Sequence, residues 1–175
     1  WAQSNITGTI TRNMCVSGGD IADIAFVDLG FRGSLLVQTT ADDDGQDLCG
    51  FKLRAGSTQR ARWTRCKIYE FGDQSKVGGC GIIIAPNSGS GKTIQDIDID
   101  DCIFQDIANV PGIYIGAVNT YTSTAKRIAI RRPLFRNTVN YADQNCIYVL
   151  GDSTIRVLDV LIEKPKFEID QSVDA

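Results

Sequence analysis

The sequence predicts an all-β protein built from short strands stacked in a regular repeat, and three observations support this fold class. A large residue recurs at relative positions 0, +2 and +7, usually with another apolar residue at +5. This pattern occurs five times, in steps of 37, 36, 31 and 32 residues, beginning at Ile24, Ala61, Ile97, Ile128 and Val160. A second set of short apolar segments interleaves with the first, and no long segment has helical periodicity. Two strand patterns at a nearly fixed period indicate stacked repeats.

Each occurrence of the first pattern predicts two short strands separated by a tight bend. Residues 96–100 and 127–131 alternate polar and apolar side chains, as a strand with one buried face does. The apolar register then jumps by three residues before alternation resumes, so a bend is expected at each jump. These bends fall at Asp100-Asp101, Arg131-Arg132 and Glu163-Lys164. A third strand is expected in each repeat, at residues 50–53, 81–84, 112–115 and 146–149.

Equivalent strands that stack one turn apart bring equivalent residues into ladders along the axis. Two inward ladders are predicted, Phe26/Trp63/Ile99/Ile130/Ile162 and Phe31/Ile68/Phe104/Phe135/Phe167. Burial of each Phe or Ile contributes about 1.5–3 kcal/mol, so these ladders supply much of the stability. Cysteines also fall at equivalent positions, Cys66 with Cys102 and Cys49 with Cys80. We expect buried thiols there, with a stacked disulfide as the alternative.

The pattern Ile97-x-Ile99-x-x-Cys102-x-Phe104, followed by Gly112-Ile113-Tyr114-Ile115, resembles the right-handed parallel β-helix of the pectate-lyase superfamily. The resemblance covers roughly residues 20–170 and implies a right-handed single-stranded parallel β-helix of about five coils. The superfamily includes polysaccharide lyases, glycoside hydrolases, sugar epimerases, adhesins and bacteriophage tailspikes. Long, irregular coils with in-register cysteines are most similar to the tailspike type.

The sequence predicts a single β-helix domain over residues 1–175 that is a fragment of a longer chain. Neither end shows an amphipathic capping helix, so unpaired strand edges are expected at both. We therefore expect a homo-oligomer, such as a trimer, or the remainder of a larger chain to cover these edges.

Composition argues against several partners and chemistries. The formal charge is −3 and the isoelectric point about 4.9, which gives no support for a nucleic-acid partner. No apolar run approaches the length of a membrane span. The sequence has no histidine, whereas polygalacturonase-like members of the superfamily would carry a Gly-His-Gly motif. That chemistry is therefore not expected in this chain.

Paired carboxylates on the predicted outward face are the candidate catalytic residues. Asp96, Asp98 and Asp100 lie on one strand, and Arg131 follows one repeat later. Paired carboxylates across adjacent repeats act as general acid and base on a glycosidic bond, or hold a divalent cation that neutralises an acidic sugar. The enzyme class in that case is a glycoside hydrolase or a polysaccharide lyase. The alternative is a solvated face whose charges serve solubility.

Stacked tyrosines are the candidate substrate-binding residues. Tyr114 and Tyr148 occupy equivalent outward positions in adjacent repeats, and Tyr121 lies in a following loop. Two exposed phenol rings form a flat amphipathic platform that packs on sugar rings. Plain cross-strand stacking and contact with a neighbouring subunit are the alternatives.

A run of aspartates is the candidate metal site. Asp42, Asp44 and Asp47 superficially resemble a calcium loop, but the Asp-x-Asp-x-Asp-Gly spacing is not met. A solvated turn is expected, with Ca²⁺ as the alternative and no other cofactor.

Three functions remain open on these grounds. The first is a polysaccharide-binding or depolymerising β-helix of the viral tailspike or adhesin type, located outside the cell or on the virion surface. The second is a free carbohydrate-active enzyme, a polysaccharide lyase or sugar epimerase. The third is a non-catalytic structural β-helix. No nucleic-acid or membrane partner is expected.

Overall fold

The computed structural model describes residues 15–18, 20–33, 49–70, 80–86, 91–107, 111–116, 122–136, 146–151 and 155–168. Within these ranges the chain contains fifteen strands and no helix. Nothing in the described ranges therefore has the length and apolarity of a membrane-spanning helix. The prediction of an all-β fold built from parallel sheets is confirmed.

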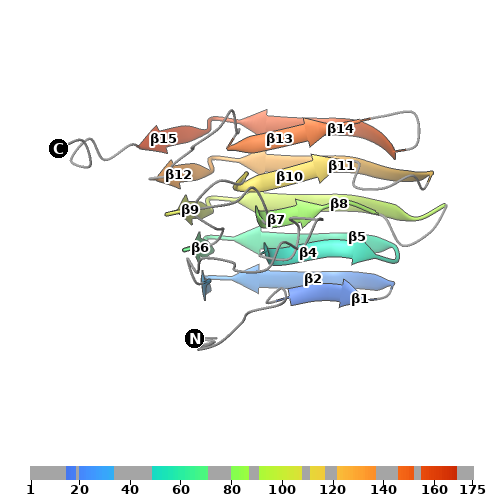
Figure 1. Ribbon diagram of the computed structural model, residues 1–175, viewed down its shortest axis with the longest axis horizontal. Helices are drawn as coiled ribbons and strands as arrows, with labels where there is room; N and C mark the ends of the chain where they lie inside the picture. The colour runs from blue at the N-terminus through green and yellow to red at the C-terminus, as the bar shows by residue number, and fades with distance from the viewer. Residues whose placement is uncertain are drawn as a thin grey trace, which may run out of the picture.

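The strands form three parallel sheets, and each sheet takes every third strand along the chain (Figure 1). The first sheet has the order β1 (Cys15–Gly18), β4 (Cys49–Ala55), β7 (Cys80–Ile84), β10 (Ile113–Gly116) and β13 (Ile147–Leu150). The second sheet contains β2 (Ile21–Val27), β5 (Thr58–Thr64), β8 (Thr93–Asp100), β11 (Ser123–Arg131) and β14 (Ile155–Glu163). The third contains β3 (Gly30–Arg32), β6 (Lys67–Tyr69), β9 (Ile103–Gln105), β12 (Leu134–Arg136) and β15 (Lys166–Glu168).

Each set of three consecutive strands, here called a repeat, lies on the preceding repeat. The described strands make repeats 1 to 5, from β1–β3 to β13–β15. In Figure 1 they rise as successive layers from blue to red, with the first sheet in front of the second and its strands pointing the opposite way. This arrangement is compatible with a parallel β-helix.

The register of the sheets confirms both predicted inward ladders. Ile99 pairs with Trp63 on one side and with Ile130 on the other. Phe104 likewise lies between Ile68 and Phe135. Equivalent residues therefore lie directly opposite each other in adjacent repeats, as the repeat spacing predicted.

The three sheets enclose one apolar core. The Phe51 ring of the first sheet lies 4.9 Å from Phe26, 5.3 Å from Trp63 and 4.3 Å from Phe31, measured between ring centroids. Trp63 is fully buried, as expected for a core residue. Because the inward faces of all three sheets meet in this core, their outward faces point away from one another.

Residues in the left-handed backbone region form the bends between the second and third sheets. The predicted bends at residues 101, 132 and 164 are confirmed, with φ values of 53°, 51° and 50°. The same left-handed conformation also occurs inside the strands of the second sheet, five residues before each bend, for example at Asp96 and Arg127. This mid-strand bulge was not predicted, although its signal is present: inward residues such as Ile94 and Ile97 are three positions apart instead of two.

Gly81 of β7 and Gly112, directly before β10, make room for the phenylalanine ladder of the third sheet. A Cβ on Gly81 would lie 2.5 Å from the carbonyl oxygen of Gly112 and 2.9 Å from the Phe104 ring. A Cβ on Gly112 would lie 2.6 Å from the Phe135 ring. Repeat 5 has Cys146 at this position, and its phenylalanine, Phe167, is 60% exposed.

We expect Gly81→Ala to destabilise the protein by about 1–3 kcal/mol, because the added methyl group overpacks against a carbonyl oxygen and an aromatic ring. Thermal and urea unfolding measure this loss. Gly30→Ala is the matched control, since a Cβ there meets only the Tyr69 ring, at 3.8 Å. Equal stability of the two variants would contradict the packing described.

Candidate functional site

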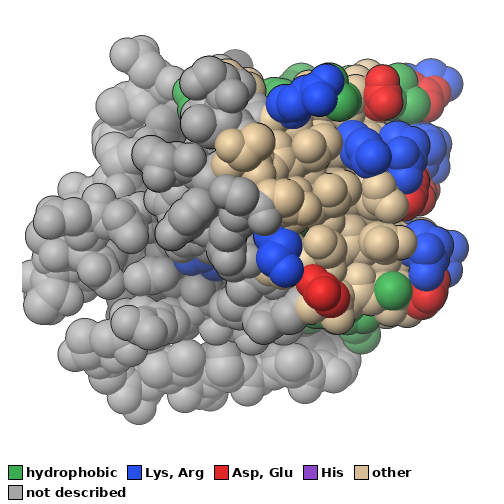
Figure 2. Space-filling view, turned by 90° about the vertical axis from the view of Figure 1, so that its right-hand side faces the viewer, with side chains coloured by type: hydrophobic (Ala, Val, Ile, Leu, Met, Phe, Trp, Pro, Cys, Tyr) green, Lys and Arg blue, Asp and Glu red, His purple; other side chains and the backbone are tan. Residues whose placement is uncertain are grey.

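Two ladders of charged side chains run along the outside of the second sheet, and each alternates acid and arginine through repeats 1 to 4. The bulge ladder consists of Asp23, Arg60, Asp96, Arg127 and Asp159, and the bend ladder of Asp28, Arg65, Asp101, Arg132 and Lys164. All ten residues have positive φ. Figure 2 shows basic and acidic side chains beside one another at successive levels of the stack. The left-handed backbone therefore gives every repeat two outward charged positions.

Each aspartate of repeats 1 and 3 in these ladders binds the arginine of the following repeat through two parallel hydrogen bonds. In the bulge ladder, Arg60 donates to Asp23 at 2.5 and 2.7 Å, and Arg127 donates to Asp96 at 2.6 and 2.9 Å. In the bend ladder, Arg65 with Asp28 and Arg132 with Asp101 repeat this geometry at 2.6–2.8 Å. These hydrogen bonds lower the pKa of all four carboxyl groups below the usual value of 3.8.

The predicted catalytic residues divide between this ladder and a separate cluster. Asp96 belongs to the bulge ladder, and its carboxylate accepts two hydrogen bonds from Arg127. Asp98 and Asp100 both accept hydrogen bonds from the same nitrogen of Arg131, at 2.8 and 3.1 Å. Three of the four predicted residues therefore form one cluster, and the fourth is engaged in another ion pair.

The geometry of this cluster limits its chemistry. Because both carboxylates contact one nitrogen, their nearest oxygens lie within about 6 Å of each other, which is below the ~6.5–9.5 Å separation of inverting glycosidases. A retaining mechanism would need room for the glycosidic bond between the two carboxylates. Instead, the Arg131 guanidinium donates hydrogen bonds to both carboxylates. The arrangement suits binding of polar groups better than proton transfer.

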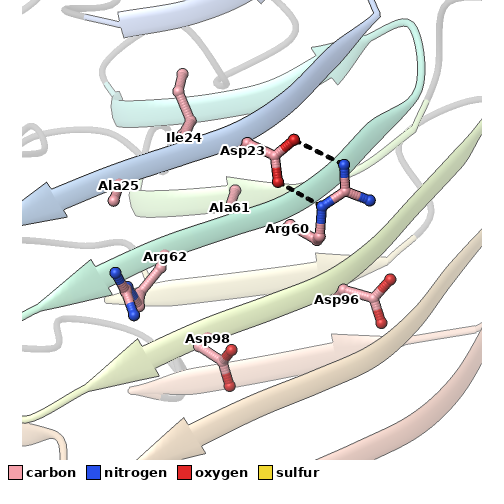
Figure 3. A pocket seen from close by; sticks show the side chains of 8 residues that line it. All are labelled: Asp23, Ile24, Ala25, Arg60, Ala61, Arg62, Asp96 and Asp98. Carbon is pink, nitrogen blue, oxygen red and sulfur yellow. Dashed lines mark hydrogen bonds and ion pairs between the residues drawn. The ribbon is translucent and has the colours of Figure 1, made fainter.

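A groove lies beside this cluster on the outer face of β2, β5 and β8. Its volume is about 310 Å³, and its lining residues are Asp23, Ile24, Ala25, Arg60, Ala61, Arg62, Asp96 and Asp98. Figure 3 shows Arg60 held by Asp23, whereas the Arg62 guanidinium stands apart from the carboxylates drawn with it. Arg62 lies directly between Ala25 and Asp98 in the sheet register.

Arg62 is a functional candidate that the sequence pattern places on the outward face but does not single out. It is exposed and makes no hydrogen bond or ion pair with any residue the structure describes. In the same sheet, Arg60, Arg127 and Arg131 all bind carboxylates. The sequence does contain a signal. The equivalent outward residue in repeat 1 is Ala25, and its short side chain leaves space beside Arg62.

The predicted tyrosine platform has the expected register but a different environment. Tyr114 pairs with Tyr148, and their ring centroids are 5.4 Å apart with the planes at 31°. Both side chains are only half-exposed, and Ile83 and Lys52 at the equivalent positions are buried. The two rings are therefore less exposed than expected, and their contact with a sugar stays a prediction. Tyr114 packs against a small apolar cluster of Cys80, Ile83 and Ala85.

The tyrosines and the carboxylates lie on different faces of the molecule. Tyr114 and Tyr148 belong to the first sheet, and Asp98 and Asp100 to the second, with the core between the two sheets. Tyr121 lies outside the described residues, so its place relative to the other two stays a prediction. One short sugar segment cannot reach both faces.

The predicted calcium site lies outside the described residues, since Asp42, Asp44 and Asp47 all fall in the range 34–48. Among the residues that the structure describes, no group of three or more carboxylate or cysteine side chains is arranged to hold a metal ion. The calcium hypothesis stays a prediction.

The predicted cysteine ladder is present in the core. Cys66 and Cys102 are buried free thiols one repeat apart. The Cys66–Cys102 hydrogen bond and burial raise the pKa of the Cys102 thiol. Cys49 pairs with Cys80 in the register, as expected. Cys66 and Cys102 pack in the main core, and Cys80 packs in the small cluster with Ile83 and Ala85, so none of these three lines the outer groove.

Comparison with protein-family profiles, curated proteins and solved structures finds no significant match.

The ion pairs of the bulge ladder predict a pH-dependent stability. The folded pKa of Asp96 lies below 3.8, so its pair with Arg127 stabilises the fold above about pH 3.8 and loses this contribution as the pH falls through the folded value. We expect Arg127→Gln to lower the urea midpoint near pH 7, with the difference from wild type shrinking as the pH falls below about 3.8 and the Asp96 carboxylate takes up a proton.

Arg156→Gln is the control for this measurement, because Arg156 is exposed on the same sheet and pairs with no described residue. It should leave the midpoint unchanged throughout this pH range. A loss of stability for Arg127→Gln that does not shrink as the pH falls below about 3.8 would mean that the side chain acts through packing and not through the ion pair.

Proposed function

We propose that this chain is a polysaccharide-binding β-helix and that the groove beside Arg62 is its binding site. The proposed architecture is a right-handed single-stranded parallel β-helix of about five coils that spans residues 1–175 as one domain. The repeated strand order of the three sheets supports this architecture. The observation that supports the function is an exposed arginine without a described partner in a groove otherwise lined by paired charges.

The groove offers both kinds of hydrogen-bonding group that a sugar needs. A sugar hydroxyl donates one hydrogen bond and accepts others, as a serine hydroxyl does. Arg62 supplies donors, and the carboxylate of Asp98 on the adjacent strand supplies acceptors. The volume of about 310 Å³ lies at the lower end of the range for small-molecule sites, so one or two sugar units of a longer chain would occupy it.

The surrounding ion pairs hold the groove in shape before any ligand binds. Asp23 and Arg60 form one wall through two hydrogen bonds, and Asp96 is held by Arg127. Side chains that are already ordered lose little conformational entropy when a ligand arrives. A rigid sheet face with fixed charges therefore suits a repetitive, extended ligand such as a polysaccharide.

The tailspike or adhesin type is the class we propose within the pectate-lyase-like superfamily, on the residue pattern of strands β8–β10. Such a protein would act outside the cell or on a virion surface, and a homo-trimer is the oligomer that this class implies. Hydrolysis, with Asp98 and Asp100 as the reacting carboxylates, is secondary to binding because Arg131 lies on both groups. A free lyase or epimerase remains the alternative.

A non-catalytic structural role is favoured by one specific observation. Both charge ladders are paired through repeats 1 to 4, so most charged groups of the sheet face serve the stack itself. In that case the protein would be a rigid spacer, and no polysaccharide would bind at Arg62.

We expect Arg62→Ala to weaken polysaccharide binding at least tenfold, because about 1.4 kcal/mol of hydrogen bonding is lost with the guanidinium. A panel of neutral and acidic bacterial and algal polysaccharides, read by affinity electrophoresis and titration calorimetry, measures the change. Arg156→Ala is the matched control, since Arg156 is exposed on the same sheet but distant from the groove. Absence of binding to every polysaccharide, or equal binding by the two variants, would overturn the proposal.

Depolymerisation, if the panel reveals any, should depend on the carboxylate cluster. We expect the double variant Asp98→Asn, Asp100→Asn to lose the release of reducing ends, because amides neither protonate a leaving group nor attack a sugar. Asp101→Asn is the control, since that carboxylate is held by Arg132 in the bend ladder. Turnover that survives in the double variant would exclude these two residues as catalytic.

A further inference from the structure

The two arginines that line the groove differ in their pairing. Arg60 donates two hydrogen bonds to Asp23, whereas Arg62 is exposed and makes no hydrogen bond or ion pair with any residue the structure describes. Figure 3 shows the Arg62 guanidinium standing apart from the carboxylates of Asp23, Asp96 and Asp98. The donors of this guanidinium are therefore available to a ligand.

The carboxylates that line the groove already accept hydrogen bonds from arginines. The pairs are Asp23 with Arg60, Asp96 with Arg127, and Asp98 with Arg131. Asp100 shares Arg131 but does not line the groove. An anionic ligand group at Arg62 therefore meets no carboxylate of the lining that lacks a cationic partner.

A second cation without a described partner lies beside the groove. Gln59, Gln95 and Lys126 occupy one outward row of the sheet register, next to the bulge ladder. Lys126 is half-buried and makes no hydrogen bond or ion pair with a described residue, although it acts electrostatically on Asp96 of the lining. Gln95 likewise has no hydrogen-bond partner in the described part of the chain. The row adds a positive charge and an amide to the polar surface next to the groove.

An arginine in this state distinguishes charged sugars from neutral ones. Its planar fork matches two oxygens of a carboxylate or a sulfate, and such charge-assisted pairs are roughly twice as strong as hydrogen bonds between neutral groups. A neutral sugar offers only hydroxyl and ring oxygens as acceptors, so Arg62 gains less from it. The groove of about 310 Å³ holds the sugar unit that carries the charged group.

We propose that the groove selects acidic polysaccharides, whose carboxylate or sulfate groups bind directly to the guanidinium of Arg62. This inference rests on the proposed polysaccharide-binding function and adds the class of ligand to it. A second charged group along the same chain contacts Lys126, and sugar hydroxyls between the two contact Gln95. No bridging cation takes part in this recognition.

Matched pairs of polymers test this selectivity. One pair is a uronate-containing polysaccharide before and after reduction of its carboxyl groups to hydroxymethyl groups, and the other is a sulfated polysaccharide before and after desulfation. In titration calorimetry with EDTA present, the wild-type protein should bind a charged polymer about tenfold more tightly than its neutral form, because the neutral form lacks the charge-assisted hydrogen bonds. The pair that shows this preference identifies the bound group as carboxylate or sulfate.

Substitutions assign the preference to particular side chains. Arg62→Gln should remove most of it, since the amide keeps hydrogen-bonding atoms but carries no charge, and Arg62→Lys should retain only part because the fork is lost. Lys126→Gln should weaken binding of the charged polymer about threefold at low salt and leave the neutral form unaffected. Lys166→Gln, which removes an exposed cation from the third sheet, is the control and should behave like wild type. An unchanged thermal midpoint confirms that each variant folds.

The outcomes separate this inference from the proposed function. Equal binding of charged and neutral polymers, lost in Arg62→Gln, would contradict the selectivity and leave the polysaccharide site standing. Failure of every polymer to bind would remove the proposed function and the selectivity with it. Charged polymers that bind only when calcium replaces EDTA would also overturn the inference, because a bridging cation would then recognise the charge in place of Arg62.

Discussion

Direct stacking of equivalent residues is the constraint from which the rest of this structure follows. Adjacent strands of a parallel sheet lie about 4.8 Å apart, so each side chain meets its counterpart one repeat away. Inside the stack this favours like with like: the rings of Phe104 and Phe135 stack at 5.2 Å, and those of Phe135 and Phe167 at 5.6 Å. The glycines at positions 81 and 112 are part of this arrangement, because the rings lie against their backbone.

Outside the stack the same constraint has the opposite consequence. Like charges at equivalent positions would repel each other, and both ladders alternate acid and arginine through repeats 1 to 4. The alternation is a matter of specificity more than of energy, since exposed ion pairs contribute little individually. If a strand paired with the strand two repeats away instead of the adjacent one, Asp23 would lie opposite Asp96, and Arg60 opposite Arg127. The ladders thus support the register that the apolar core also requires.

Arg62 lies outside both ladders, in register between an alanine and an aspartate that Arg131 already binds. The arginines of the two ladders, by contrast, are each matched by a carboxylate of the fold. The proposal of a polysaccharide in the groove rests on this difference between Arg62 and the paired charges that line the same groove.

The sequence by itself determined the strands, their stacking order, both inward ladders and the bends, because the apolar period repeats often enough to fix the register. It also brought Asp98, Asp100 and Arg131 together correctly. Tertiary structure alone decided that Asp96 belongs to a separate ladder, since the mid-strand bulge turns its side chain toward Arg127. It also decided that Tyr114 is half-buried and lies on the face opposite the carboxylates. Alternation along one strand tells inward from outward, but what surrounds an outward residue depends on which sheets enclose the core.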